Sequence, residues 1–225
     1  MSTRPEILFP LLAGLETLDG VGPRSVENFK GLAVEKPRDL LFTLPYSGIA
    51  RRPVATVQMA DLPKVLTVEV TVGHHMRPSA RGRPYRVEVT DAATTFQLVF
   101  FHAHPDYLEK ILPTGSRQVV SGKVELFDGI AQMTHPDHVV PPHEAGQIPD
   151  FEPVYPKTAG STQKLMLKAT GGALARAAAL PEWIDGSLKQ ERHWPDWQAA
   201  VARAHRPQAA MELSAEDPAR ARLAY

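Results

Sequence analysis

Residues 66–72 read LTVEVTV, residues 85–90 read YRVEVT and residues 96–101 read FQLVFF. Each stretch alternates apolar and polar side chains, a period of two that is typical of a strand with one buried face. In the third stretch the alternation turns Phe101 outward, away from the predicted core. An exposed large aromatic side chain calls for a functional reason.

The segments that follow complete a recognisable strand order. Residues 106–112 form an amphipathic pattern that predicts a short helix, and a strand is expected over residues 118–126. The Asp-Gly pair at 128–129 predicts a tight hairpin turn into a last strand over residues 130–133. Five strands with a helix between the third and the fourth are the order of an OB-fold, a small barrel that commonly binds single-stranded nucleic acid or oligosaccharide. We therefore predict an α+β protein built around a five-stranded OB-fold barrel.

Helical patterns flank the strands, so the sequence predicts three units. They are a helical lead-in over residues 1–60, the OB-fold over residues 61–140, and a Pro-rich connector with a helical extension over residues 141–225. Proline marks the second join, where six prolines lie between residues 136 and 156.

The helical lead-in contains a glycine turn. Residues 15–29 read LETLDGVGPRSVENF and are similar to a helix-hairpin-helix motif. In such a motif the turn, here Gly20 to Gly22, exposes backbone N–H groups at a helix N-terminus that can hold a DNA phosphate. The same pattern also fits a helical hairpin that only packs against its neighbours.

The charge is balanced overall but not locally. The 225 residues carry 25 Lys and Arg against 25 Asp and Glu, which argues against a polyelectrolyte that binds nucleic acid along its whole surface. Residues 74–86, HHMRPSARGRPYR, nevertheless hold four arginines and no acid. These arginines, Arg77, Arg81, Arg83 and Arg86, could neutralise phosphates while Phe101 stacks on a base. The alternatives are a solvated loop and an aromatic side chain that a neighbouring unit covers.

Several chemistries are excluded or disfavoured. With no cysteine there is no disulfide framework, thiolate metal site or cysteine nucleophile. The sequence also lacks a hydrolase motif and the Gly-x-x-x-x-Gly-Lys-Ser/Thr loop of nucleotide hydrolases, so we assign no catalytic residue. The pairs His102/His104 and His135/His138 have spacings that a metal enzyme could use, but we assign no metal. No apolar run is long enough to cross a bilayer and no signal peptide is apparent, so we expect a cytoplasmic monomer.

Short segments spread over the chain carry a family resemblance. They are LDGVGP at 18–23, DLL at 39–41 with LP at 44–45, FFH at 100–102 with YL at 107–108, SGKV at 121–124, QM-x-HP at 132–136, PVYP at 153–156, and residues 219–225. Together they resemble the N-terminal wedge region of bacterial RecG, the ATP-dependent DNA helicases that remodel stalled replication forks and Holliday junctions.

The resemblance implies a function in DNA repair and recombination. The OB-fold would be the wedge that splits the arms of branched DNA, with Phe101 and Tyr107 stacking on unpaired bases. ATP and Mg²⁺ would belong only to the helicase motor domains, which the chain would precede and contact. The alternative that the residues leave open is a protein-interaction module without direct DNA contact.

Overall fold

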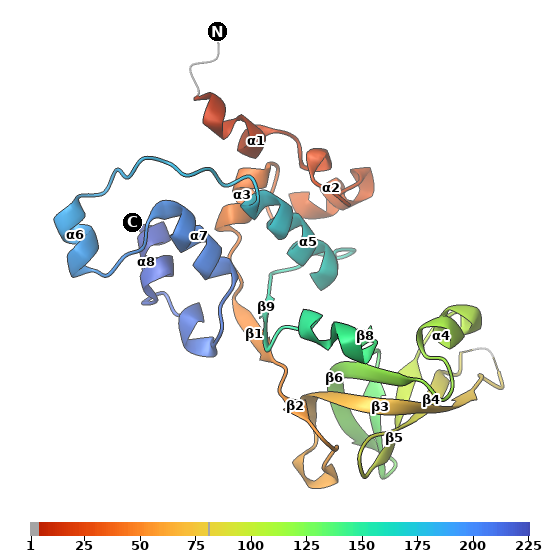
Figure 1. Cartoon of the computed structure of the whole chain (residues 1–225). Helices are drawn as coiled ribbons and strands as arrows, with labels where there is room; N and C mark the ends of the chain where they lie inside the picture. Colours follow the sequence, from red (N-terminus) through yellow and green to blue (C-terminus); the bar gives the residue numbers. More distant parts are fainter. Residues whose placement is uncertain (1–4, 81) are drawn as a thin grey trace. The chain divides into compact units, whose positions relative to one another are not determined.

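The computed structural model describes residues 5–80 and 82–225, which form two compact units. A barrel unit spans Ala50–Asp150, and a helical unit combines Met1–Ile49 with Phe151–Tyr225 (Figure 1). The outer thirds of the chain, expected as separate units, thus share one unit, and the barrel unit begins and ends about ten residues outside the predicted borders at 60 and 140.

The barrel unit contains the sheet. Its elements are β2 (Pro53–Val54), η3 (Met59–Asp61), β3 (Lys64–Met76), β4 (Tyr85–Thr90), β5 (Thr95–Phe100), α4 (Pro105–Ile111), β6 (Arg117–Phe127), β7 (Ile130–Thr134), β8 (His138–Val140) and η4 (Pro142–Gln147). The strand order is β2-β3-β4-β5-β7-β6-β8, and an additional pairing of β3 with β6 closes the five long strands into a barrel. Among these five strands only β5 and β7 pair in parallel. This closure, with α4 between the third and fourth long strands, confirms the predicted OB-fold.

The long strand β3 makes the closure possible. Residues 64–71 pair with β6, residues 71–76 pair with β4, and the register shifts between Val72 and His75. Gly73 lies in that shift, where an added Cβ would come within 3.1 Å of a backbone oxygen of β4. The bend lets one strand serve both sides of the barrel.

Alternation along the strands fills the barrel as predicted. The aliphatic residues of β3 from Leu66 to Val72 are buried, and so are the inward residues of β4 and β5. Leu108 of α4 and Leu112 behind it enter the same core. The helix is thereby fixed at the end of the barrel where β5 ends.

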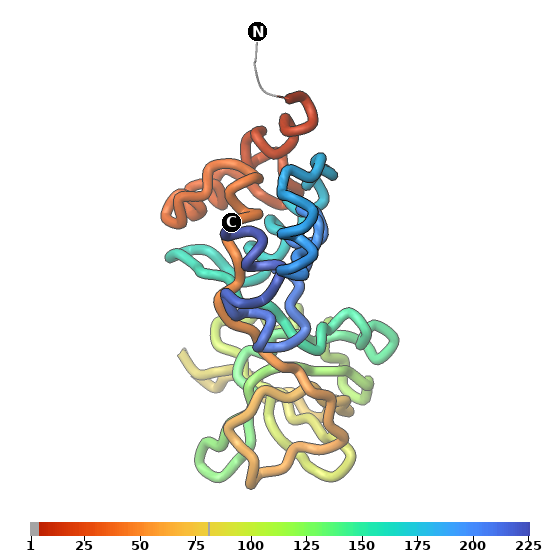
Figure 2. The backbone as a smooth tube through the Cα atoms, turned by 90° about the vertical axis from the view of Figure 1, so that its left-hand side faces the viewer, coloured from red at the N-terminus to blue at the C-terminus, as the bar shows by residue number. Residues whose placement is uncertain are grey.

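The helical unit is built from both ends of the chain. Its elements are η1 (Glu6–Leu8), α1 (Phe9–Leu12), η2 (Leu15–Thr17), α2 (Pro23–Lys30), α3 (Pro37–Phe42), β1 (Ser47–Ala50), β9 (Phe151–Val154), α5 (Gln163–Leu174), α6 (Gly186–Glu191), α7 (Trp197–His205), η5 (Ala210–Leu213) and α8 (Pro218–Ala224). Phe29 and Leu40 share one hydrophobic core with Tyr155, Met166 and Val201. In Figure 2 the red and orange N-terminal segments accordingly lie together with the blue C-terminal ones in this unit.

A buried histidine joins the two segments of the helical unit. His205 of α7 lies 2.9 Å from the Leu41 carbonyl through Nε2 and 2.9 Å from the Tyr155 hydroxyl through Nδ1. Since a carbonyl can only accept, Nε2 donates to Leu41. Burial lowers the pKa of His205 and so favours its neutral form, in which Nδ1 accepts from the Tyr155 hydroxyl.

This arrangement predicts a pH-dependent stability of the helical unit. Below about pH 6.5 the unfolded chain binds a proton at this histidine while the folded chain resists it until its lower pKa is reached. The contribution of the neutral His205 to the free energy of unfolding should thus be fully present near pH 7.5. The free energy of unfolding should fall as the pH drops below 6.5, by at most about 1.4 kcal/mol per pH unit. Thermal unfolding followed by circular dichroism from pH 7.5 to 5 measures this. His205→Gln, which keeps a neutral donor for Leu41, should flatten the dependence; an equally steep dependence in that variant would assign it to other groups.

Candidate nucleic-acid interface

Phe101 lies directly after β5 and is 43% exposed, as the alternation of its strand predicts. Its backbone N–H donates to Nε2 of His135 over 3.2 Å. The two rings lie 5.8 Å apart between centroids, tilted by 36°. The aromatic side chain is thus exposed while its backbone is anchored.

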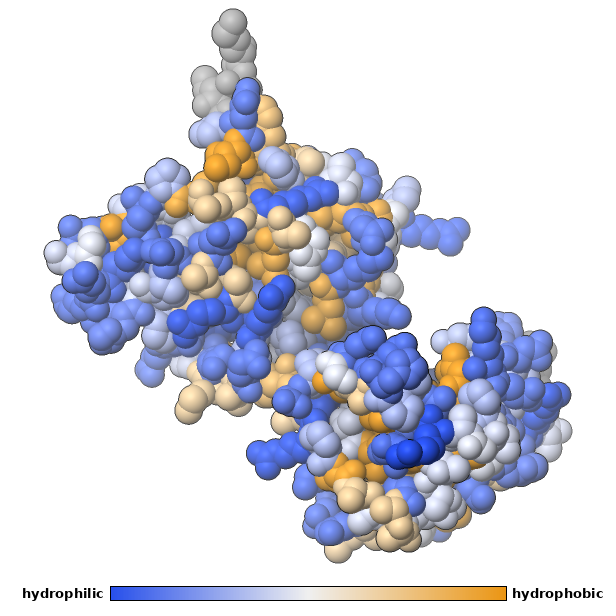
Figure 3. Space-filling model, viewed as in Figure 1, coloured by the Kyte–Doolittle hydropathy of each residue, from blue (hydrophilic) through white to orange (hydrophobic). Residues whose placement is uncertain are grey.

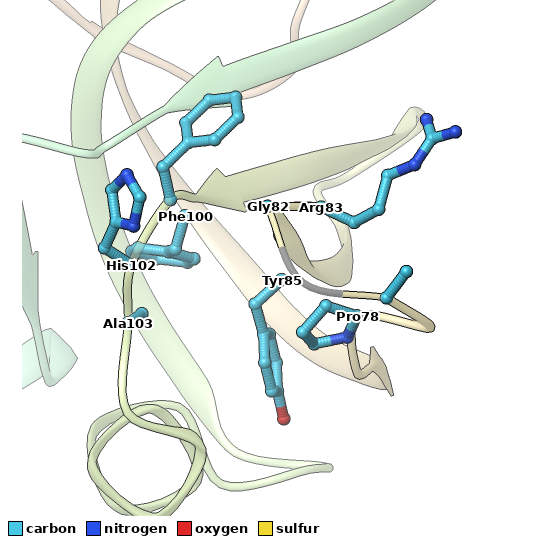
Figure 4. Close-up of a pocket in the computed structure, with 9 residues that line it drawn as sticks. Pro78, Gly82, Arg83, Tyr85, Phe100, His102 and Ala103 are labelled. Atoms are coloured by element: carbon cyan, nitrogen blue, oxygen red, sulfur yellow. The ribbon is translucent and has the colours of Figure 1, made fainter.

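Phe101 borders a small hollow at the end of the barrel (Figure 4). The hollow measures about 140 Å³ and is lined by Pro78, Ala80, Gly82, Arg83, Tyr85, Phe100, Phe101, His102 and Ala103. The arginine-rich segment between β3 and β4 therefore shares a surface with Phe101. In Figure 4 the Arg83 side chain extends away from Phe100 and Tyr85, so its guanidinium group points outward from the hollow.

The four predicted arginines differ in their surroundings. Arg77 forms an ion pair with Glu109 of α4 at 2.6 Å, which raises the pKa of Arg77 and lowers that of the Glu109 carboxyl. Among the residues that the structure describes, Arg83 and Arg86 have no acidic partner. Arg81 lies outside the described residues. The arginine-rich segment contains no acidic residue, but α4 places the acidic residue Glu109 beside it.

Glu109 is part of a network that holds α4 to the barrel. The buried Tyr85 hydroxyl lies 2.9 Å from Nδ1 of His75 and donates to Glu109 over 3.3 Å, and burial together with the Glu109 charge raises the pKa of Tyr85. Nε2 of His75 in turn donates to the Leu112 carbonyl over 2.8 Å. Tyr107, two residues before Glu109, projects from this fixed helix with 61% of its surface exposed.

The glycine turn belongs to the helical unit and differs from the prediction. In place of a first helix, Leu15–Thr17 form a single 3₁₀ turn, because Leu18 leaves the helical conformation ahead of the turn at Gly20. Gly20 has φ +74°, a conformation that favours glycine, and Gly22 caps the N-terminus of α2 with extended backbone. The turn therefore precedes one helix rather than joining two.

Lys168 of α5 covers this turn. It pairs with Asp19 at 2.9 Å, and a Cβ added to Gly20 would lie 2.6 Å from its Nζ. Sequence reasoning missed this lysine, because nothing in the spacing of α5 relates it to a turn almost 150 residues earlier.

A second missed residue is Arg51. Its side chain is 1% exposed, and the guanidinium donates to the Ser121 hydroxyl over 3.1 Å and to the Asp137 carboxylate over 3.0 Å. Asp137 follows His135 by two residues, so a buried arginine supports the segment that contacts Phe101. The adjacent Arg52 is exposed, and the sequence offers no signal that separates the two.

The histidine pairs lie apart from any metal-binding cluster within the part of the chain that the structure describes. In residues 5–80 and 82–225 no group of three His, Asp or Glu side chains is placed to hold a metal ion. His135, one of the paired histidines, accepts the Phe101 N–H instead. Every helix within the described part of the chain is too short or too polar to cross a bilayer.

Comparisons with known proteins agree with the RecG resemblance. No family model matches the chain. It is 26% identical over 224 residues to the ATP-dependent DNA helicase RecG of Acidithiobacillus ferridurans, covering 95% of this chain and 31% of that protein. It is 21% identical over 192 residues to RecG of Aquifex aeolicus, covering 81% of this chain and 24% of the relative.

A solved structure shares the fold. A RecG bound to a three-way DNA junction matches with a TM-score of 0.75 and 23% identity, over 94% of this chain and 29% of that one. The chain thus spans less than a third of the length of the proteins it matches. This chain is RecG-like over nearly its whole length, and its middle part is an OB-fold barrel.

Proposed function

We propose that this chain binds branched DNA through the end of its barrel that carries Phe101. The observation that carries the proposal is an exposed aromatic side chain, anchored by its backbone, on the same surface as Arg83, which has no acidic partner among the described residues. The solved relative of the same fold is a RecG bound to a three-way junction, which supports branched DNA as the ligand.

Each candidate residue has a distinct role in this proposal. Phe101 stacks on an unpaired base at the branch point, and Tyr107 extends the aromatic surface along α4. Arg81, Arg83 and Arg86 neutralise phosphates. Arg77 acts less directly, because it is paired with Glu109 and holds α4 in place.

The glycine turn is a separate candidate contact. The N–H groups beyond Gly20 and Gly22 would hold a phosphate, and Lys168 lies beside them, where its pairing with Asp19 leaves it in the same indirect position as Arg77. Hydrolysis of ATP is not assigned to this chain, because its sequence lacks the phosphate-binding loop. ATP, Mg²⁺ and strand separation belong in this proposal to the motor domains of a RecG-like helicase.

Phe101→Ala should weaken binding to a forked DNA by about 1–3 kcal/mol, the cost of losing one base-aromatic stack. Affinity for plain duplex DNA should stay unchanged, since no unpaired base is available there. Fluorescence anisotropy with labelled fork and duplex at low salt measures both. The matched control is Phe127→Ala, because Phe127 is also an exposed phenylalanine of the barrel, 58% exposed, at the hairpin between β6 and β7.

The same anisotropy measurement, repeated at increasing salt concentration, separates DNA binding from the protein-interaction alternative. Phosphate contacts make the logarithm of the affinity fall linearly with the logarithm of the salt concentration, by about 0.9 per phosphate neutralised. On the face seen in Figure 3, hydrophobic residues of the barrel unit lie in small groups between hydrophilic ones, which favours a polar ligand. Equal affinity for fork and duplex, or an intact affinity in Phe101→Ala, would reject the proposed function.

A further inference from the structure

His135 contacts Phe101 in two ways and Phe100 in a third. Besides the hydrogen bond to the Phe101 N–H and the tilted ring contact, its imidazole forms a T-shaped contact with the Phe100 ring, at 89° with centroids 6.2 Å apart. Phe100 is buried in the barrel core, whereas Phe101 is exposed. The imidazole therefore contacts both a buried ring and an exposed one.

The hydrogen bond from the Phe101 N–H to Nε2 of His135 replaces a backbone hydrogen bond that the sheet lacks at this position. In the parallel pair of β5 with β7, the His135 N–H donates to the Val99 carbonyl over 2.8 Å. A continued parallel ladder would next place the Phe101 N–H on the carbonyl of residue 135. His135 instead has φ +48°, which ends the strand, and its own side chain accepts that N–H. Nε2 of His135 thus supplies the acceptor that the parallel ladder no longer offers to the Phe101 N–H.

The segment behind His135 is itself held firmly. The Asp137 carboxylate accepts a hydrogen bond from the buried Arg51. His138 begins β8 and pairs with Ser121 of β6. At Gly122 an added Cβ would lie 3.3 Å from Cα of Pro136, so the backbone packs closely against β6. His135 is anchored on both sides, whereas Phe101 opens the irregular segment that leads to α4.

We propose that His135 is a positioning residue that holds Phe101 ready to stack on a base. This inference rests on the proposed function and adds a residue that the function does not itself require. An exposed loop residue loses conformational freedom when a ligand orders it, and a group fixed in advance avoids most of that loss. Nε2 must be unprotonated to accept, so the neutral imidazole with its proton on Nδ1 performs this role.

The test compares two variants of nearly equal size. His135→Gln offers a carbonyl oxygen close to the position of Nε2, whereas His135→Met has an unbranched chain of similar length without a strong acceptor. Both place an ordinary Cβ at φ +48°, so their backbone strain is matched. Amide hydrogen exchange, measured by NMR on the full chain without DNA, reports the hydrogen bond of Phe101 directly.

We expect the Phe101 amide to exchange at about the original rate in His135→Gln and about tenfold faster or more in His135→Met. Fork affinity should follow, nearly unchanged in the first variant and about fivefold weaker in the second, the effect of one lost hydrogen bond. An unchanged exchange rate in His135→Met overturns the inference. So does an equal loss of fork affinity in both variants, or a fork affinity in His135→Met that stays at the original value while Phe101→Ala lowers it. The exchange measurement needs no DNA, so its failure is distinct from a failure of the proposed function, which the fork-against-duplex comparison and Phe101→Ala decide.

Discussion

Residues 50–150 produced alone should fold, whereas residues 1–49 produced alone should be unfolded. The barrel unit contains its whole hydrophobic core, from Val57 to Met133, within its own 101 residues. Helices α1, α2 and α3 have only four, eight and six residues, and isolated helices shorter than about 12–15 residues are marginal in water. Their apolar faces pack on Met166, Ala173 and Val201, all of which lie beyond residue 150.

A third polypeptide makes the prediction sharper. The Tyr46 N–H donates to the Val154 carbonyl over 3.1 Å and the Arg51 N–H to the Asp150 carbonyl over 2.8 Å, so the chain leaves the helical unit and returns to it side by side. Replacing residues 50–150 by a short glycine linker should therefore give a folded helical unit. Circular dichroism and amide dispersion by NMR compare the three polypeptides. Cooperative unfolding of residues 1–49 alone, or a failure of the linked unit to fold, would contradict the shared core.

The barrel could be predicted from sequence because its signals are local. Alternation over six or seven residues defines the strands β3, β4 and β5, and the Asp-Gly turn fixes the hairpin between β6 and β7. The outward direction of Phe101 follows from the same parity. Once the strand order is known, the position of α4 between the third and fourth long strands admits few closed arrangements.

The shared helical core could not be predicted in this way. An amphipathic helix shows which of its faces is buried but not which segment covers it. The pattern around Phe29 is therefore compatible with a separate N-terminal unit, although its partners come from α5 and α7. A similar limit applies at the glycine turn, where Lys168 arrives from α5.

The sequence could indicate which residues share the candidate surface but not the electrostatics of that surface. The arginine-rich segment and Phe101 do share one surface. The pairing of Arg77 with Glu109 depends on where α4 packs, and a count of charges along the sequence cannot show it. In the sequence, His135 belongs to a pair spaced as metal ligands can be and to one segment of the family resemblance, and neither feature indicates the contact with Phe101, which arises from a left-handed backbone at the end of β7.

Arg51→Ala should lower the free energy of unfolding of the barrel unit by about 3 kcal/mol. The substitution removes hydrogen bonds of a charged donor, those to Ser121 and Asp137 among them, each worth about 1.5–3 kcal/mol, and leaves a cavity. Part of this loss is recovered because Ser121 and Thr67 keep their mutual hydrogen bond of 2.8 Å. Urea unfolding followed by circular dichroism measures the difference.

The neighbouring arginine provides the control for this comparison. Arg52→Ala removes the same side chain from an exposed position and should change stability by less than about 0.5 kcal/mol. Arg51→Met fills much of the volume without the donors, so its stability should lie between those of Arg51→Ala and the original chain. If Arg51→Met were as stable as the original, packing alone would account for the buried arginine. If Arg51→Met were instead as unstable as Arg51→Ala, the hydrogen bonds of Arg51 would account for its contribution. Those bonds fix Asp137, and through it the segment that holds His135 against Phe101.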